Sequence, residues 1–332
     1  MTALTVLMKQ SIKNRFSPPT SAWLTLAVFV LFALAVPRFA TFGNIENVLR
    51  IASILCIVAC GQALVLILGG IEFSFGSSVA LASIMTVLML PDFGVAGGFA
   101  AGVAVVLLVG AFNGALIARF DLPPFLVTLG TLMAVAGLAA TLAGGLPIDA
   151  PLTDAFTWPA RGRVGGVPVP IIAAVLSFIA LYGLLTHTHI GRLWYLVGAN
   201  SEAARLSGIR VRLTIFAGYV VASGFCAVAS IILTSRVGSG QPGLAPNLPF
   251  ETIAACAIGG IPLSGGQGRA SQVACGVLII AMMNNAVVLL NLPVAYQQLM
   301  MAAVILGTVV LQRASGPIQV MWHLLARRGG PQ

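Results

Sequence analysis

Long apolar runs, separated by short polar or glycine-rich segments, make up most of the chain from residue 21 onwards. A transmembrane helix needs about 20 mainly apolar residues to cross the hydrocarbon core of a bilayer. Runs of about this length, with one shorter member, cover residues 21–36, 49–68, 71–90, 95–118, 125–143, 168–186, 213–233, 252–263, 271–290 and 296–312. The pattern predicts an all-α fold, a polytopic transmembrane helical bundle of about ten spans.

The shorter run, residues 252–263, has too few residues to cross a bilayer as a straight helix. A helix that ends inside the membrane is tolerated where protein or a water-filled cavity surrounds its backbone. We therefore expect a short or broken helix here, and nine spans remain an alternative if it does not cross. The predicted organisation is a tail at residues 1–20, a membrane domain at 21–312 with a polar loop at 187–212, and a tail at 313–332.

The composition supports a membrane protein. Hydrophobic residues make up 59% of the chain and charged residues 8%, against roughly 25% charged residues in soluble domains. The net charge of +9 does not indicate a nucleic-acid partner, because basic residues in loops and tails orient a chain in the lipid bilayer. With ten spans, the basic 187–212 loop and both termini face the cytoplasm, whereas Arg161 and Arg163 face outside.

No motif in the sequence indicates a cofactor, a metal site or covalent catalysis. The five cysteines lie inside apolar runs, where a thiol usually serves as a small buried side chain. The three histidines are confined to the polar loop and the C-terminal tail. No Ser-His-Asp set or pair of carboxylates is evident. We therefore expect a protein that is not itself an enzyme.

The polar loop at 187–212 contains a predicted short helix. Asn200 or Ser201 can cap its start, and Gly208 can end it. A helix this short is not stable alone in water, so it needs a protein or membrane surface. We predict a cytoplasmic docking helix, and the alternative is an ordinary solvated loop. Its residues are Asn200, Ser201, Glu202, Ala203, Ala204, Arg205, Leu206, Ser207 and Gly208.

Two glycine-rich segments resemble each other. Residues 69–76 read GGIEFSFG and residues 259–266 read GGIPLSGG. Such interruptions at matching places in two halves are typical of a transport pathway near the membrane midplane, although chance similarity is an alternative in a chain with 37 glycines. We predict an internal pseudo-repeat with helix breaks at Gly69, Gly70, Gly259 and Gly260. Gly97 and Gly98, near the outer end of the fourth span, should instead tolerate a side chain.

The second glycine-rich segment continues as LSGGQ at residues 263–267, which is the signature peptide of ATP-binding-cassette ATPases. A nucleotide site would also need a GxxxxGK[ST] phosphate loop with its lysine. The lysines of the chain are Lys9 and Lys13, and neither has that spacing. We interpret the pentapeptide as a glycine-rich turn.

A few polar side chains interrupt the apolar runs and are candidates to line a pathway. Glu72 is an acid embedded in a continuous apolar stretch, and such a group is a functional candidate by default; alternatively, it is hydrated at a membrane edge. Amides on apolar helices, such as Gln297 and Gln298, commonly form hydrogen bonds with neighbouring helices. They can also form hydrogen bonds with hydroxyl-rich substrates. For Glu251, at the start of its helix, a capping role is expected. The candidate pathway residues are Glu72, Phe73, Ser74, Asn113, Thr128, Asn284 and Asn285.

Four segments together resemble a known family. They are GGIEFSFGSS (69–78), NGALIARFDLPPFLVTLGTL (113–132), IGRLWYLVGANSEAARLSGI (190–209) and AIGGIPLSGGQG (257–268). The chain resembles the permease subunit of bacterial ABC sugar importers of the ribose/xylose/galactoside type over about residues 45–312. It departs from that family at Glu72, where Asp is usual, and at Phe73 and Phe75, where Leu and Val are usual.

This resemblance implies partners and a mechanism. It makes residues 200–209 the coupling helix that docks on a cytoplasmic ABC ATPase, either double-cassette or dimeric. It also implies a second permease copy or paralogue, a periplasmic sugar-binding protein, a monosaccharide substrate and a location in the bacterial inner membrane. Two alternatives remain: an ABC permease for branched-chain amino acids or nucleosides, and an ion-coupled secondary transporter that uses Glu72.

Overall fold

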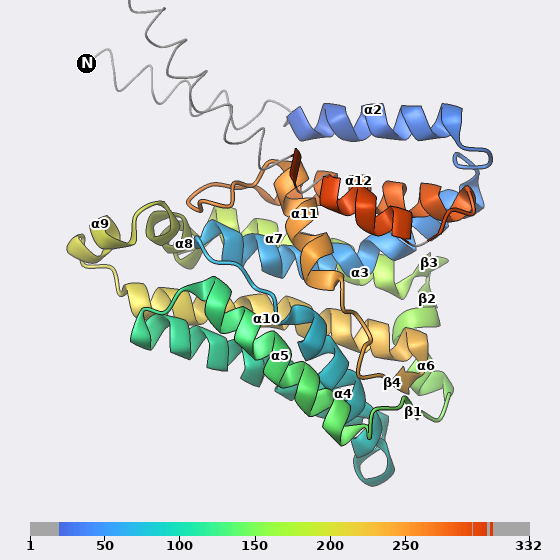
Figure 1. Cartoon of the computed structure of the whole chain (residues 1–332), viewed down its shortest axis with the longest axis horizontal. Helices are drawn as coiled ribbons and strands as arrows, with labels where there is room; N and C mark the ends of the chain where they lie inside the picture. The colour runs from blue at the N-terminus through green and yellow to red at the C-terminus, as the bar shows by residue number, and fades with distance from the viewer. Residues whose placement is uncertain (1–19, 294, 304–305, 308–332) are drawn as a thin grey trace, which may run out of the picture.

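The computed structural model describes residues 20–293, 295–303 and 306–307, and the described part of the chain is almost entirely helical (Figure 1). Its helices are α2 (Thr20–Ala35), α3 (Phe42–Ile67), α4 (Phe75–Phe120), α5 (Pro124–Leu142), α6 (Asp154–Arg161), α7 (Val169–His187), α8 (His189–Ala199), α9 (Ser201–Leu206), α10 (Val211–Val237), α11 (Leu248–Gly259) and α12 (Ala270–Leu289). Residues 295–303 are also helical. The predicted all-α membrane fold is therefore confirmed.

Very little sheet accompanies these helices. Strand β1 (Ile148–Asp149) pairs antiparallel with β4 (Ser239–Gly240), and β2 (Arg163–Val164) pairs antiparallel with β3 (Val167–Pro168). The four strands and α6 gather at the right-hand end of the bundle in Figure 1, whereas α8 and α9 lie at the left-hand end. The predicted docking helix thus lies at the opposite end of the molecule from Arg161 and Arg163, which are predicted to face outside.

Six helices in the described residues are long and apolar enough to cross a membrane, namely α3, α4, α5, α7, α10 and α12. Helix α4 has 46 residues, but it is interrupted at Gly94, whose backbone angles are not helical (φ 65, ψ −173) and which follows Pro91 closely. The chain reverses there, as Figure 1 shows at the lower right, so α4 supplies two arms that match the predicted runs 71–90 and 95–118.

The three remaining predicted spans are not established as crossing the membrane. Helices α2 and α11 are shorter apolar helices of 16 and 12 residues. The short helix expected at 252–263 is present as α11, displaced by a few residues toward the N-terminus. The last predicted span, 296–312, lies partly outside the described residues. The count of ten spans therefore stays a prediction.

Helix α3 forms the centre of the bundle. It packs against α7, α10, α11 and α12, and all ten non-glycine side chains from Ile57 to Ile67 are fully enclosed at 0% exposure. Large apolar side chains such as Leu31, Leu126 and Leu176 are exposed on α2, α5 and α7 instead. Because a bilayer favours apolar surface, these outer helices are suited to contact lipid.

Small residues let α10 approach its neighbours closely. A Cβ atom on Gly61 of α3 would lie 2.5 Å from the carbonyl oxygen of Ala222, and a Cβ on Gly114 of α4 would lie 3.0 Å from Cβ of Tyr219. Close backbone approach through small residues is the usual basis of helix association in membranes. The expectation that Gly97 and Gly98 tolerate a side chain was wrong, because a Cβ on Gly98 would lie 2.7 Å from the carbonyl oxygen of Thr86 in the other arm of α4 and one on Gly97 would overlap Cβ of Phe93.

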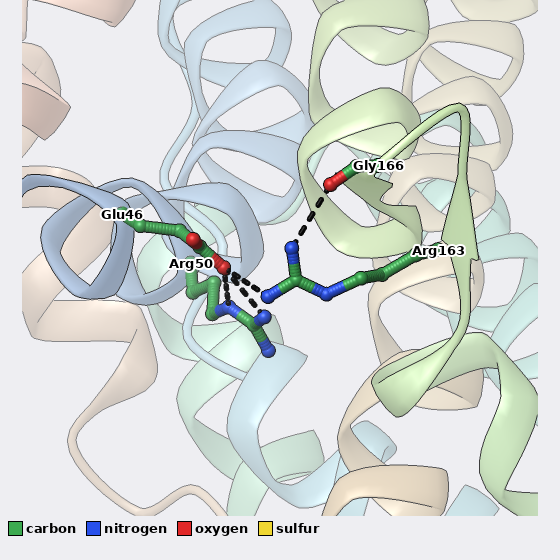
Figure 2. Close-up of polar contacts among 4 residues, drawn as sticks. All are labelled: Glu46, Arg50, Arg163 and Gly166. Atoms are coloured by element: carbon green, nitrogen blue, oxygen red, sulfur yellow. Dashed lines mark hydrogen bonds and ion pairs between the residues drawn. The ribbon is translucent and has the colours of Figure 1, made fainter. Parts of the chain in front are cut away.

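An ion-pair cluster fixes the β2–β3 hairpin to the start of α3 (Figure 2). Oε1 of Glu46 lies 2.6 Å from a guanidinium nitrogen of Arg50 and 2.6 Å from one of Arg163. Arg163 also donates to the carbonyl oxygen of Gly166 at 2.9 Å, inside the hairpin turn. One carboxylate between two guanidinium groups joins the hairpin to α3, and the cluster of these three side chains keeps a net positive charge.

Candidate functional site

The polar loop folds into two consecutive short helices, α8 and α9. Thr188 caps α8 by accepting a hydrogen bond from the backbone of Gly191 at 3.0 Å. Trp194 anchors the helix, because its ring is fully buried and its indole nitrogen donates to the carbonyl oxygen of Thr214 at 3.3 Å. Tyr195 donates its hydroxyl to the carbonyl oxygen of Gly268 at 2.7 Å. Helix α8 is therefore fixed to both α10 and the loop before α12.

Helix α9 has the cap and the stop that the sequence predicts. Asn200, rather than Ser201, is the N-cap, and its side-chain oxygen accepts from the backbone of Ala203 at 2.9 Å. Gly208 adopts a left-handed conformation (φ 80), and the backbone of Ile209 donates to Ala204 at 3.1 Å. This bonding closes the helix end as glycine C-caps commonly do. The prediction of a short capped helix is confirmed, and its docking role stays a prediction.

The outer surface of α9 carries a charged pair and an apolar side chain. Glu202 and Arg205 form an ion pair at 2.6 Å, and the hydrogen bond from Arg205 holds the pKa of the Glu202 carboxyl below its usual value. Leu206 is 79% exposed, whereas Ala204 is buried against the bundle. A pair this exposed adds little to stability. The face of α9 that points away from the bundle is thus available for a protein contact.

The two glycine-rich segments lie in contact with each other. Residues 69–76 include the non-helical link between α3 and α4, and residues 259–266 begin the link between α11 and α12. Gly69 (φ 81) and Gly260 (φ 97) have left-handed conformations that favour glycine. The backbone of Gly266 donates to the carbonyl oxygen of Ile67 at 2.8 Å. Gly69 and Gly70 follow the end of α3, Gly259 is the last residue of α11 and Gly260 follows it, so the functional role of these breaks and the question of duplication stay predictions.

The end of α8 packs into the same place. A Cβ atom on Gly265 would lie 2.7 Å from Cα of Gly69 and 2.9 Å from the carbonyl oxygen of Gly198, and one on Gly266 would lie 2.7 Å from Cα of Ala199. We call Gly69, Gly198, Gly265 and Gly266 the glycine junction. The backbone at the end of α8 therefore packs directly against both glycine-rich links. The LSGGQ peptide is a loop, as expected, and two of its glycines belong to this junction.

A buried polar network stabilises the link between α3 and α4, which we call the first link. Glu72 is 1% exposed, so a hydrated position at a membrane edge is excluded. Its carboxylate accepts from the backbone and the hydroxyl of Ser74 at 2.7 and 2.6 Å, and from the amide of Asn113 at 3.0 Å. Asn113 in turn accepts from Thr131 at 2.7 Å. The network joins the link to the second arm of α4 and to α5.

Most of the predicted pathway residues are enclosed in this conformation. Thr128 donates to the carbonyl oxygen of Ile71 at 3.0 Å, so it too stabilises the link. Asn285 exchanges two amide hydrogen bonds with Asn44 of α3, both at 2.9 Å, which is the interhelical bonding that polar groups on apolar helices commonly make. Asn284 is half-buried. Their role in a pathway stays a prediction.

Among the predicted pathway residues, Phe73 packs against two other aromatic rings. Its ring is 5.5 Å from the ring of Phe125 and 5.7 Å from the ring of Phe250, measured between centroids. Phe250 lines a hollow of about 270 Å³ at the start of α11. The residues that line it are Asn247, Phe250, Glu251, Gln297, Gln298, Met301 and Ala302.

Glu251 therefore has a different environment from the one expected. The N-cap of α11 is Asn247, and the carboxylate of Glu251 makes no capping bond in the described part of the chain. The sequence singled out Gln297 and Gln298 as amides on an apolar helix but did not single out Asn247 or Phe250. Neither of these two interrupts an apolar run, so hydropathy alone carried no signal for them.

These features define an integral membrane protein of the permease class, with broken helices that meet the short helices α8 and α9. A permease family described as "Branched-chain amino acid transport system / permease component" matches residues 44–309, and the chain belongs to this family. The resemblance found in the sequence is thereby confirmed.

Several relatives are similar over most of their length. The ribose import permease protein of Escherichia coli is 34% identical over 308 residues, which cover 88% of this chain and 95% of that protein. The ribose import permease protein of Bacillus subtilis is 37% identical over 295 residues, covering 86% and 89%. The L-arabinose transport system permease protein of Escherichia coli is 33% identical over 287 residues, covering 86% and 87%. No solved structure shows a significant match to the chain.

Proposed function

We propose that this chain is the permease subunit of an ABC importer that carries a monosaccharide, a pentose or hexose, across the bacterial inner membrane. The observation that carries this proposal is the similarity to ribose and arabinose permeases, 33–37% identical over at least 86% of the chain. A separate cytoplasmic ATPase supplies the energy, and a periplasmic binding protein delivers the sugar. The subunit itself is not an enzyme.

The geometry suggests how ATP binding in the cytoplasm is linked to the opening of the translocation pathway. ATP binding closes the ATPase subunits and displaces α9, which docks on them. Because Gly198 and Ala199 lie directly before the α9 cap and touch Gly265 and Gly266, the glycine junction passes this movement to both links. The translocation pathway then changes the side of the membrane to which it opens. A loaded binding protein favours one of these states, which is linkage between two distant sites.

The family description itself names branched-chain amino acids, so a permease for those substrates is the second candidate. A reconstituted importer distinguishes the two. Permease, ATPase and binding protein in liposomes should take up labelled ribose or arabinose when ATP is supplied, and labelled leucine should not accumulate. ATP-dependent uptake of leucine without uptake of either sugar would overturn the sugar assignment.

The orientation gives the first prediction. We propose that α9 and both termini face the cytoplasm and that α6 faces the periplasm, because the basic loops favour the cytoplasmic side. Single cysteines introduced at Ser201 and at Arg161 should therefore react with a membrane-impermeant maleimide from opposite sides. The parent chain is the control, since its described cysteines are buried or half-buried. Labelling of both positions from outside would contradict this orientation.

A charge exchange on α9 tests its docking role. The double variant Glu202→Arg with Arg205→Glu keeps an ion pair three residues apart, so the helix itself should remain stable. The surface presented to the ATPase is reversed in charge. We expect normal membrane insertion, but loss of uptake and of the ATPase stimulation caused by the loaded binding protein.

The matched control exchanges charges at the other end of the molecule, as Asp154→Arg with Arg161→Asp, at two exposed positions of α6 that form no ion pair within the described residues. It should retain both uptake and the ATPase stimulation caused by the loaded binding protein. If the α9 variant retains full uptake with normal stimulation, α9 is an ordinary loop helix.

A further inference from the structure

The hollow at the start of α11 differs chemically from the rest of the membrane domain. Helix α11 lies between α12 and the first arm of α4, near the middle of the bundle in Figure 1. The lining brings together one carboxylate (Glu251), three amides (Asn247, Gln297 and Gln298) and one aromatic ring (Phe250). These side chains come from two segments about fifty residues apart in the sequence. They meet because α11 and helix 295–303 lie against each other.

Glu251, Gln297 and Gln298 differ from the Glu72 network in their contacts with the described part of the protein. The Glu72 carboxylate accepts three hydrogen bonds from described neighbours. For Glu251, Gln297 and Gln298, the described residues supply no side-chain hydrogen bond or ion pair. An uncompensated acid within a membrane domain is costly and is expected where it has a function. The Glu251 group is half-buried and faces open space.

This set of side chains suits a small polyhydroxylated ring. A carboxylate and amides accept and donate hydrogen bonds to hydroxyl groups, and an aromatic ring provides an apolar face for the C–H side of a sugar. Ligand sites usually combine apolar walls with a few such polar groups. An amino acid fits less well, since its ammonium group would pair with Glu251 but the lining contains no lysine or arginine for its carboxylate. The hollow, about 270 Å³, is of a size for a small ligand.

We propose that this hollow is a sugar-contact site in the translocation pathway. Glu251, Gln297 and Gln298 bind the sugar hydroxyls, and Phe250 packs against the ring, with Phe73 supporting Phe250 from the side. The site rests on the proposed function, because it assigns the substrate class of the same importer. It is distinct from the enclosed Glu72 network, which holds the first link in shape.

Uptake by the complete importer in liposomes tests the proposal. Variants Glu251→Gln and Phe250→Ala should lower the maximal rate of ribose or arabinose uptake about tenfold, the effect of losing one charge-assisted hydrogen bond or one ring contact. The sugar concentration at half-maximal rate should not change, because the binding protein sets it. ATPase stimulation by the loaded binding protein should persist. Phe250→Tyr, which keeps the ring, should retain most of the rate.

The control is Phe112→Ala, which removes an aromatic ring of similar exposure from the outer surface of α4. Rates for Glu251→Gln and Phe250→Ala equal to that of the control would overturn the proposal. If the wild-type importer itself takes up no sugar, the proposed function fails instead, so the two failures are distinguishable.

A second measurement does not depend on how the variants fold. Gln298→Cys places a thiol at an exposed position in the hollow. Modification with a maleimide after assembly should block uptake in this variant, and the same treatment of the unsubstituted importer should not. Full uptake after complete modification would also overturn the site.

Discussion

Replacing Gly265 with valine is expected to abolish sugar uptake while the protein still reaches the membrane. Gly265 has φ 83, a conformation that β-branched residues rarely adopt. Its Cβ would also lie 2.7 Å from Cα of Gly69 and 2.9 Å from the carbonyl oxygen of Gly198. Since these neighbours are backbone atoms, the clash cannot be relieved by a side-chain rotation. Uptake and membrane abundance, measured together, give the result.

A matched control is available on α5. Gly130 is helical, and a Cβ atom there would meet no atom within 4 Å. Gly130→Val should therefore retain uptake, since valine also has a higher helix propensity than glycine. Gly70→Val should behave like the Gly265 variant, because its Cβ would lie 2.5 Å from the buried Tyr219 hydroxyl. Normal uptake by Gly265→Val would show that α9 is not linked to the helix breaks through the glycine junction.

The sequence predicted the fold class and the local form of α9 because these depend on neighbouring residues. Apolar runs near 20 residues, the Asn200 cap and the Gly208 stop are all local signals. Span counting was less successful. The division of α4 into two arms near Gly94 was predictable, because the apolar runs on either side were counted as separate spans. The apolar runs at α2 and α11 were also counted as spans, but both helices are shorter than a full span.

The organisation of the site depended on contacts that no local pattern contains. Glu72 was identifiable as an embedded acid, but its enclosure by Ser74 and Asn113 depends on residues up to 41 positions apart. The glycine junction likewise joins segments near residues 69, 198 and 265. The hollow was missed because Phe250 and Asn247 look ordinary in the sequence. Such groupings follow from packing between helices rather than from periodicity along them.

Substitution of Glu72 is expected to have a comparably large effect, for a structural reason. Glu72→Ala removes the acceptor for the Ser74 backbone, the Ser74 hydroxyl and the Asn113 amide. Each buried polar group left without a partner costs about 1–3 kcal/mol. We expect a lower melting temperature for the solubilised protein and nearly complete loss of uptake. Glu72→Gln keeps one acceptor oxygen for Ser74 but turns an amide toward Asn113, so an intermediate loss is expected.

The same residue distinguishes ATP-driven from ion-driven transport. In a proton-coupled transporter, Glu72 would have to exchange protons with water during the cycle, yet it is 1% exposed and bonded on both carboxylate oxygens. With ATP held constant inside the assay, a protonophore should therefore leave uptake unchanged in the wild-type importer. The residual uptake of Glu72→Gln should be equally insensitive. Collapse of wild-type uptake by the protonophore would contradict the ABC assignment and make Glu72 the coupling acid.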